Sequence, residues 1–125
     1  MQYFERKIIF HGDHFMEFYL EQKPNVQEKI EFVFRIIRQV ERVSKKFLDH
    51  MEGSDGLYEI RIEVGSNIFR IFCCFDEGKV VVLFNGFQKK TQKTPKNVIE
   101  KANKLMQEYF QLKKKNNEKG PNKKS

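Results

Sequence analysis

Basic side chains gather in two parts of the chain, and their types suit phosphate binding. Arg61 and Arg70 stand inside otherwise apolar segments. A short loop farther along carries three lysines, Lys89, Lys90 and Lys93. Thr94 and Pro95 then open a predicted helix, whose first backbone N–H groups and dipole favour an anion. Together these groups could bind the phosphates of RNA, although each lysine taken alone is more often a solvated surface charge.

The arginines belong to a predicted antiparallel meander of three strands within residues 57–95. Two turn signals separate its apolar runs, at Gly65-Ser66-Asn67 and at Asp76-Glu77-Gly78. In the first strand, alternation places Tyr58, Ile60, Ile62 and Val64 on the core face. The opposite face is polar, so we expect it to be solvated. The third strand, Lys79 to Asn85, is rich in valine and is expected to be central or buried, and Asn85-Gly86 is expected to end it.

The register of this meander follows from its first turn. A two-residue turn at Gly65-Ser66 pairs Val64 with Asn67, and a four-residue turn gives the same register. Arg61 then lies opposite Arg70 on one face, whereas a three-residue loop would shift the pairing by one. Like charges directly opposite destabilise a sheet, which indicates an anionic ligand. The alternative is that acids on the same face, Glu59 and Glu63, neutralise the arginines.

The other elements must hold this meander in place. Residues Tyr3 to Phe10 predict a first strand, and Asp13 could cap a helix that runs to about Gln22. A second helix starts at Pro24, with an apolar stripe at Val26, Ile30, Val33, Ile37 and Val40. These helices form an α-hairpin on one face of the sheet. The predicted order is β-α-α-β-β-β-α, an α+β fold with a small antiparallel or mixed four-stranded sheet and a C-terminal helix.

Composition places the chain among single-domain proteins with a focused basic region. The formal net charge is +7 over 125 residues, and the surplus lies in the last third, which suits a polyanion or an acidic partner. We expect one domain over residues 1–112 and a basic, disordered tail over 113–125. Cys73 and Cys74 are expected to be buried hydrophobes, because adjacent strand residues face opposite ways. Without a signal peptide or a membrane span, the protein is expected to be cytoplasmic.

Three segments, LYEIRI, NIFRI and VLFNGFQKKTQKTP, closely resemble the RelE/HigB superfamily of toxins from type II toxin–antitoxin modules. The resemblance covers residues 48–109 and is closest to the HigB-like branch that is often labelled phage-derived. It implies a RelE-like fold and a ribosome-dependent mRNA endoribonuclease that needs no metal or cofactor. The ribose 2′-OH would attack the adjacent phosphate, leaving a 2′,3′-cyclic phosphate and a 5′-OH. The implied partners are the ribosome, mRNA and a cognate antitoxin with a helix-turn-helix.

The resemblance also implies roles for individual residues. Arg70 would contact the scissile phosphate, and Arg61 occupies a basic active-site position. The further catalytic candidates are Lys90 and Lys93, which would steady the phosphate or protonate the leaving oxygen, and Glu59. The RNA- or phosphate-binding candidates are Lys89, Thr91, Gln92 and Lys46. Tyr109 is expected to be a core residue rather than a catalytic one.

The residue that accepts the 2′-OH proton stays open at the sequence level. Arginine is a poor base because it hardly deprotonates. The candidates are Glu59, a lysine with a lowered pKa, or His50 if its connection folds over the site. The lack of a clear base also supports an alternative, a non-catalytic RelE-like module that binds nucleic acid or a partner protein.

Overall fold

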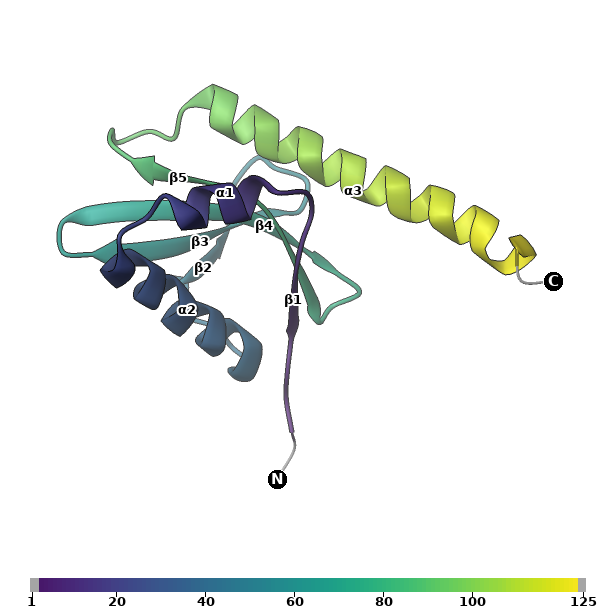
Figure 1. The fold of residues 1–125 in the computed structure, drawn as a ribbon, viewed down its shortest axis with the longest axis horizontal. Coiled ribbons are helices and arrows are strands. Elements are labelled where there is room, and N and C mark those ends of the chain that lie inside the picture. Colours follow the sequence, from purple (N-terminus) through teal and green to yellow (C-terminus); the bar gives the residue numbers. More distant parts are fainter. Residues whose placement is uncertain (1–2, 124–125) are drawn as a thin grey trace.

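A computed structural model of the protein describes residues 3–123 and contains a mixed five-stranded sheet with helices on both faces (Figure 1). The elements are β1 (Lys7–Phe10), α1 (His14–Leu20), α2 (Pro24–Gln39), β2 (Leu48–His50), β3 (Leu57–Val64), β4 (Asn67–Asp76), β5 (Val80–Lys89) and α3 (Lys96–Lys123). The strand order is β1-β5-β4-β3-β2, with β1 parallel to β5 and the other pairs antiparallel. The predicted α+β class is confirmed. The sheet has five strands rather than four, because the connection before β3 contributes the short β2.

Helices α1 and α2 cover one face of the sheet, as the predicted α-hairpin requires. Their buried apolar side chains are Phe15, Phe18, Val26, Ile30, Val33, Phe34 and Ile37. They pack on strand residues that include Ile60, Ile62 and Ile71. Two boundaries differ from the prediction, since β1 begins at Lys7 and α1 ends at Leu20. Asp13 stands at the N-cap position of α1, but its side chain makes no capping hydrogen bond there.

Helix α3 covers part of the opposite face, which the sequence predicts to be solvated. A second core joins Leu57, Phe72, Cys74, Val82 and Phe84 of the sheet to Ala102, Leu105 and Met106 of α3. The expectation of a wet face is therefore wrong over this area. It overlooks Phe72 and Cys74, which share a face with Arg70 and need an apolar cover. The cysteines are buried on opposite faces, as predicted.

Strand β5 does not end at Asn85-Gly86 but continues to Lys89. Gly86 pairs with Ile71, next to an irregularity in the β4–β5 register. A Cβ atom on Gly86 would lie 2.7 Å from the Phe18 ring of α1. The glycine therefore permits the close approach of a helix and does not mark a turn. This continuation carries the end of β5 alongside Arg70.

Helix α3 is anchored to the sheet near its middle. Asp76 accepts hydrogen bonds from the Tyr109 hydroxyl at 2.7 Å and from Lys113 Nζ at 2.7 and 2.8 Å. The helix continues to Lys123, within the tail that the sequence predicts over residues 113–125. Lys124 and Ser125 lie outside the described residues. Tyr109 is a packing residue, as predicted. Within residues 3–123, no helix is both long and apolar enough to span a membrane.

Candidate phosphate-binding site

Strands β3 and β4 place the two arginines side by side. Val64 pairs with Asn67 across the tight turn, and Arg61 pairs with Arg70. This is the register predicted from the sequence. Glu59 lies two residues before Arg61 on the same strand face. The predicted residues Glu59, Arg61 and Arg70 thus share one face of the sheet, beyond the area that α3 covers.

The charges on this face are partly neutralised within the protein. Arg70 Nη1 donates to both carboxylate oxygens of Glu59, at 2.9 and 2.8 Å. These side chains are mostly buried, at 14% and 17% exposed for Arg70 and Glu59. Arg61 has a looser and more exposed contact with Glu63, at 3.7 Å. The neutralising alternative is therefore the arrangement found. Arg70 Nε is buried without a hydrogen-bond partner, which leaves a directed donor beside the ion pair.

Lys89 joins the arginines from β5. The β4–β5 register pairs Lys89 with Ile68 and Phe87 with Arg70. Burial first, and then the positive charges of Arg70 and Arg61, lower the pKa of Lys89, while Glu59 opposes this shift. Among the candidate bases, Lys89 thus supplies the lysine with a lowered pKa. It releases a proton more readily than an ordinary surface lysine.

Two residues of this site are missing from the sequence predictions. Phe87 lies opposite Arg70 and stacks on Phe72, with ring centroids 5.8 Å apart. Asp49 of β2 pairs with Glu59 and adds a third carboxylate to this face, beside Glu59 and Glu63. Phe87 was hidden by the early end predicted for β5, although the Phe87–Lys89 spacing continues the strand alternation. Asp49 was hidden because β2 has only three residues.

The remaining predicted residues lie around this cluster rather than in it. The loop between β5 and α3 exposes Lys90, Thr91, Gln92 and Lys93. The Thr91 hydroxyl donates to the Lys93 carbonyl at 2.7 Å, which ties the loop to itself. Pro95 supplies the first carbonyl of α3, accepting from the backbone N–H of Val98 and Ile99. The residue that caps α3 is therefore Pro95, one position after the predicted N-cap, Thr94.

His50 is held away from the cluster by its local contacts, and Lys46 is an exposed residue two positions before β2. The Lys46 ammonium lies 5.7 Å from the centroid of the Phe47 ring. His50 pairs with Tyr58 across β2 and β3, with ring centroids 5.1 Å apart. Tyr58 packs against the α1–α2 core, on the face opposite Arg70. The condition for His50 to act as the base, a connection folded over the site, is not met.

The cysteines do not take part in this chemistry. Burial raises the pKa of Cys74 to about 12, and burial also raises the pKa of Cys73. A thiol in such a setting stays protonated and weakly nucleophilic. Over residues 3–123, no group of three or more His, Cys, Asp or Glu side chains is arranged to hold a metal ion. The charged side chains on this face are the two arginines, Lys89 and the carboxylates of Asp49, Glu59 and Glu63.

Comparison with known proteins gives a family match and matches among solved structures. Residues 17–107 match the family described as "Phage derived protein Gp49-like (DUF891)". No curated protein matches the chain. Among solved structures, the chain is similar to one in "Crystal structure of archaeal RelE-RelB complex from Pyrococcus horikoshii OT3". The identity is 16% and the TM-score 0.45, over 72% of this chain and 99% of that chain.

Proposed function

The chain belongs to the phage-derived Gp49-like family, which is RelE-like, and on this premise we propose that it is the toxin of a type II toxin–antitoxin module. Its proposed activity is ribosome-dependent cleavage of mRNA in the cytoplasm, held in check by a cognate antitoxin. The observation that carries the proposal is the convergence of Arg61, Arg70 and Lys89 on one sheet face. Three cations on rigid strands suit a phosphate whose charge grows during reaction.

Phosphate binding would begin with an exchange of anions at Arg70. The Glu59 carboxylate now occupies Arg70 Nη1, and Arg70 Nε is free. A phosphodiester entering this place would take over the Nη1 donor in a charge-assisted hydrogen bond. Arg61 lies opposite and would add a second positive charge. Glu59 would then be released from its ion pair.

Lys89 is the residue we assign to proton transfer. Its lowered pKa gives a larger fraction of neutral amine near neutral pH than an ordinary lysine has. The neutral amine would take the proton of the ribose 2′-OH as the 2′ oxygen attacks phosphorus. The bond from phosphorus to the 5′ oxygen then breaks. That oxygen takes a proton from Lys90, Lys93 or water, which yields a 2′,3′-cyclic phosphate and a 5′-OH.

Induction in a bacterium tests this function. The natural chain should arrest growth and produce new 5′-OH ends within translated reading frames. Arg70→Ala should relieve the arrest and remove these ends. Arg35→Ala is the matched control, because Arg35 is an exposed arginine of α2, on the other side of the sheet. Full toxicity of a folded Arg70→Ala protein would reject the site assignment.

The Glu59–Arg70 ion pair favours one other candidate function. An arginine already satisfied by a carboxylate can be purely structural, as expected in a non-catalytic RelE-like module that binds nucleic acid or protein. The same induction experiment separates the two functions. Growth arrest with unchanged transcripts supports the binding module and contradicts the nuclease.

A further inference from the structure

Half of β5 has a strand neighbour on one side only. The parallel pairing of β1 with β5 ends at Phe10 and Leu83, followed by a hydrogen bond from His11 N–H to the Leu83 carbonyl. Beyond that point the chain turns into α1, while β5 continues to Lys89 beside β4. Every second residue of such an edge points its N–H and C=O away from the sheet. Within the described chain, no strand pairs with this edge of β5.

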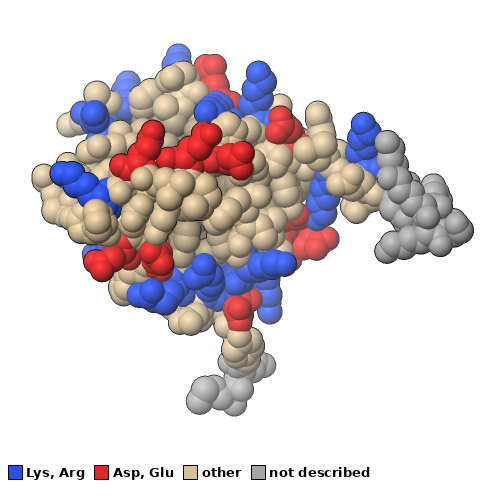
Figure 2. Space-filling model, viewed as in Figure 1, with Lys and Arg blue, Asp and Glu red and all other residues tan. Residues whose placement is uncertain are grey.

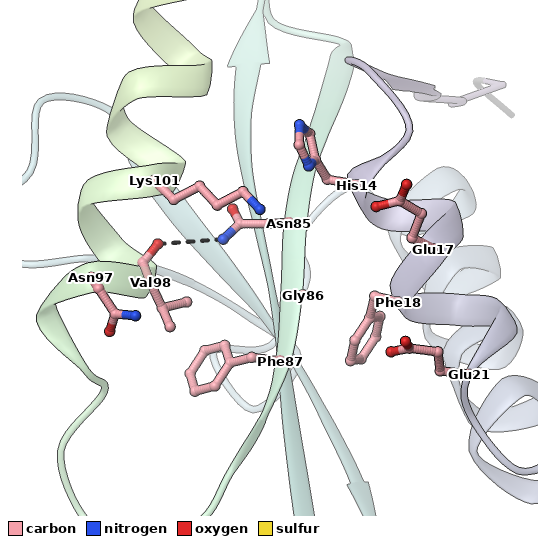
Figure 3. A pocket seen from close by; sticks show the side chains of 10 residues that line it. All are labelled: His14, Glu17, Phe18, Glu21, Asn85, Gly86, Phe87, Asn97, Val98 and Lys101. Atoms are coloured by element: carbon pink, nitrogen blue, oxygen red, sulfur yellow. Dashed lines mark hydrogen bonds between the residues drawn. The ribbon is translucent and has the colours of Figure 1, made fainter.

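A groove follows this open edge between α1 and α3 (Figure 3). One cavity of about 340 Å³ is lined by Glu17 and Glu21 on the α1 side, by Asn85 and Phe87 of β5, and by Lys101 of α3. This cavity follows β5 from Asn85 to Phe87, a length of roughly 10 Å. A second cavity of about 320 Å³ shares Glu21 and reaches Gln88, but it extends over Val64 and Phe69 on the α1–α2 face of the sheet.

Asn85 presents an unused acceptor to this groove. It is a buried polar residue, 6% exposed. Its side-chain Nδ2 donates to the Val98 carbonyl at 3.3 Å, but Oδ1 is buried without a partner. Figure 3 shows the Asn85 amide between β5 and α3, beside the Lys101 side chain. A buried carbonyl oxygen in this state is destabilising unless a donor reaches it.

The charge of the groove wall selects among possible occupants. Figure 2 shows acidic side chains in a row over α1, in a protein whose net charge is +7. Glu17 and Glu21 are four residues apart, both are exposed, and neither belongs to an ion pair found in the described part of the chain. They repel the phosphates of RNA and attract lysine or arginine. A peptide therefore fits this wall better than a nucleic acid does.

We propose that the β5 edge from Asn85 to Gln88 binds an extended segment of a partner protein as an additional strand. Main-chain hydrogen bonds would hold the segment, as in other cases of strand addition. A lysine or arginine of the segment would lie beside Glu17 and Glu21, and one of its N–H groups would reach Asn85 Oδ1. Phe87 borders both this surface and the Arg70 cluster, but the segment would pair with the open edge of β5, so the proposal does not depend on RNA cleavage.

Peptide binding to the purified full-length chain tests the proposal. The probe is a fluorescein-labelled octapeptide of alternating lysine and valine, followed by fluorescence anisotropy and by amide NMR of the ¹⁵N-labelled protein. The amide signals of residues 85–89 should shift on binding. Glu17→Lys with Glu21→Lys should weaken binding by about three- to ten-fold, since two exposed charge pairs are reversed. Glu28→Lys with Glu52→Lys reverses two exposed acids outside the groove and should change binding less than about two-fold.

The remaining outcomes would overturn the proposal. The lysine peptide with alternate backbone nitrogens methylated should not bind, because it cannot pair with a strand. An alternating glutamate–valine peptide that binds equally well contradicts the charge argument. Absence of lysine-peptide binding, or shifts confined to other residues, contradicts the site itself. A single-stranded RNA oligonucleotide that displaces the peptide and shifts the signals of Asn85 and Gly86, which lie outside the Arg70 cluster, would identify a nucleic-acid groove. Cleavage by the Glu17→Lys, Glu21→Lys protein should be unchanged, which separates this test from the nuclease proposal.

Discussion

Replacement of Glu59 by glutamine is expected to tighten RNA binding about ten-fold. In the protein, the Glu59 carboxylate accepts two hydrogen bonds from Arg70 Nη1, at 2.9 and 2.8 Å, with both side chains mostly buried. A hydrogen bond to a charged group contributes about 1.5–3 kcal/mol, and one between neutral groups about 0.5–1.5 kcal/mol. Glutamine keeps an acceptor for Arg70 but loses the charge. A phosphate would therefore displace the glutamine from Arg70 at a free-energy cost about 1–1.5 kcal/mol smaller than the cost of displacing the Glu59 carboxylate.

The assay separates binding from cleavage. Fluorescence anisotropy at fixed salt gives the Kd of an RNA oligonucleotide with a 2′-deoxy substitution that prevents cleavage, since affinity depends on salt. Glu63→Gln is the control, because it removes the same charge from the looser 3.7 Å contact with Arg61; its Kd should change less than about two-fold. An unchanged or weaker Kd for a folded Glu59→Gln protein refutes the displacement reasoning. If Glu59 is also the base, cleavage falls by about 10²–10⁴-fold even though binding tightens.

Three further predictions concern the proton acceptor, the strand and the helix anchor. Arg61→Gln removes a positive charge that lowers the pKa of Lys89. The pKa of Lys89 therefore rises, and the midpoint of the cleavage rate–pH profile should move to higher pH. An unmoved midpoint argues against Lys89 as the base. Gly86→Ala places a Cβ 2.7 Å from the Phe18 ring and should lower the free energy of unfolding by about 1–3 kcal/mol in urea titration; no loss would mean that the helix shifts freely. Burial pushes the pKa of Asp76 up, but its hydrogen bonds to α3 outweigh this and keep that pKa below its usual value. The stability that Asp76 contributes is present above its unfolded pKa of about 4 and is lost as pH falls through the lower folded pKa. Asp76→Asn should therefore flatten the acid limb of the stability curve, measured by thermal unfolding.

Much of the fold could be predicted because its signals are local. The stripe of α2 spans one helix, and four of its five predicted members are buried, namely Val26, Ile30, Val33 and Ile37. The fifth, Val40, lies just past the helix end and is exposed. The Arg61–Arg70 register depends only on the length of one tight turn. In both cases the residues that carry the information are near neighbours in the sequence. Pattern and turn chemistry then determine the geometry without knowledge of the rest of the molecule.

The errors arise where a distant element changes the meaning of a local signal. Asn85-Gly86 has the composition of a turn, but Phe18 of α1 requires the glycine, and the strand continues. The polar side chains of β3 alone predict that the sheet face with Arg70 is solvated, but α3 covers the part of that face around Phe72. Strand β2 is too short to show alternation and forms because β3 offers an edge. Tertiary packing overrides propensity in each case.

The choice of proton acceptor shows why composition cannot assign chemistry in a lysine-rich loop. Lys89 and Lys90 are adjacent and equivalent in sequence terms. Strand β5 includes the first and leaves the second exposed in the loop. Only Lys89 then stands near Arg61 and Arg70, where burial and repulsion lower its pKa. A shift of one residue in the β4–β5 register would exchange the two. The chemical role of each lysine is therefore a consequence of that register, which includes an irregularity between Ile71 and Cys73.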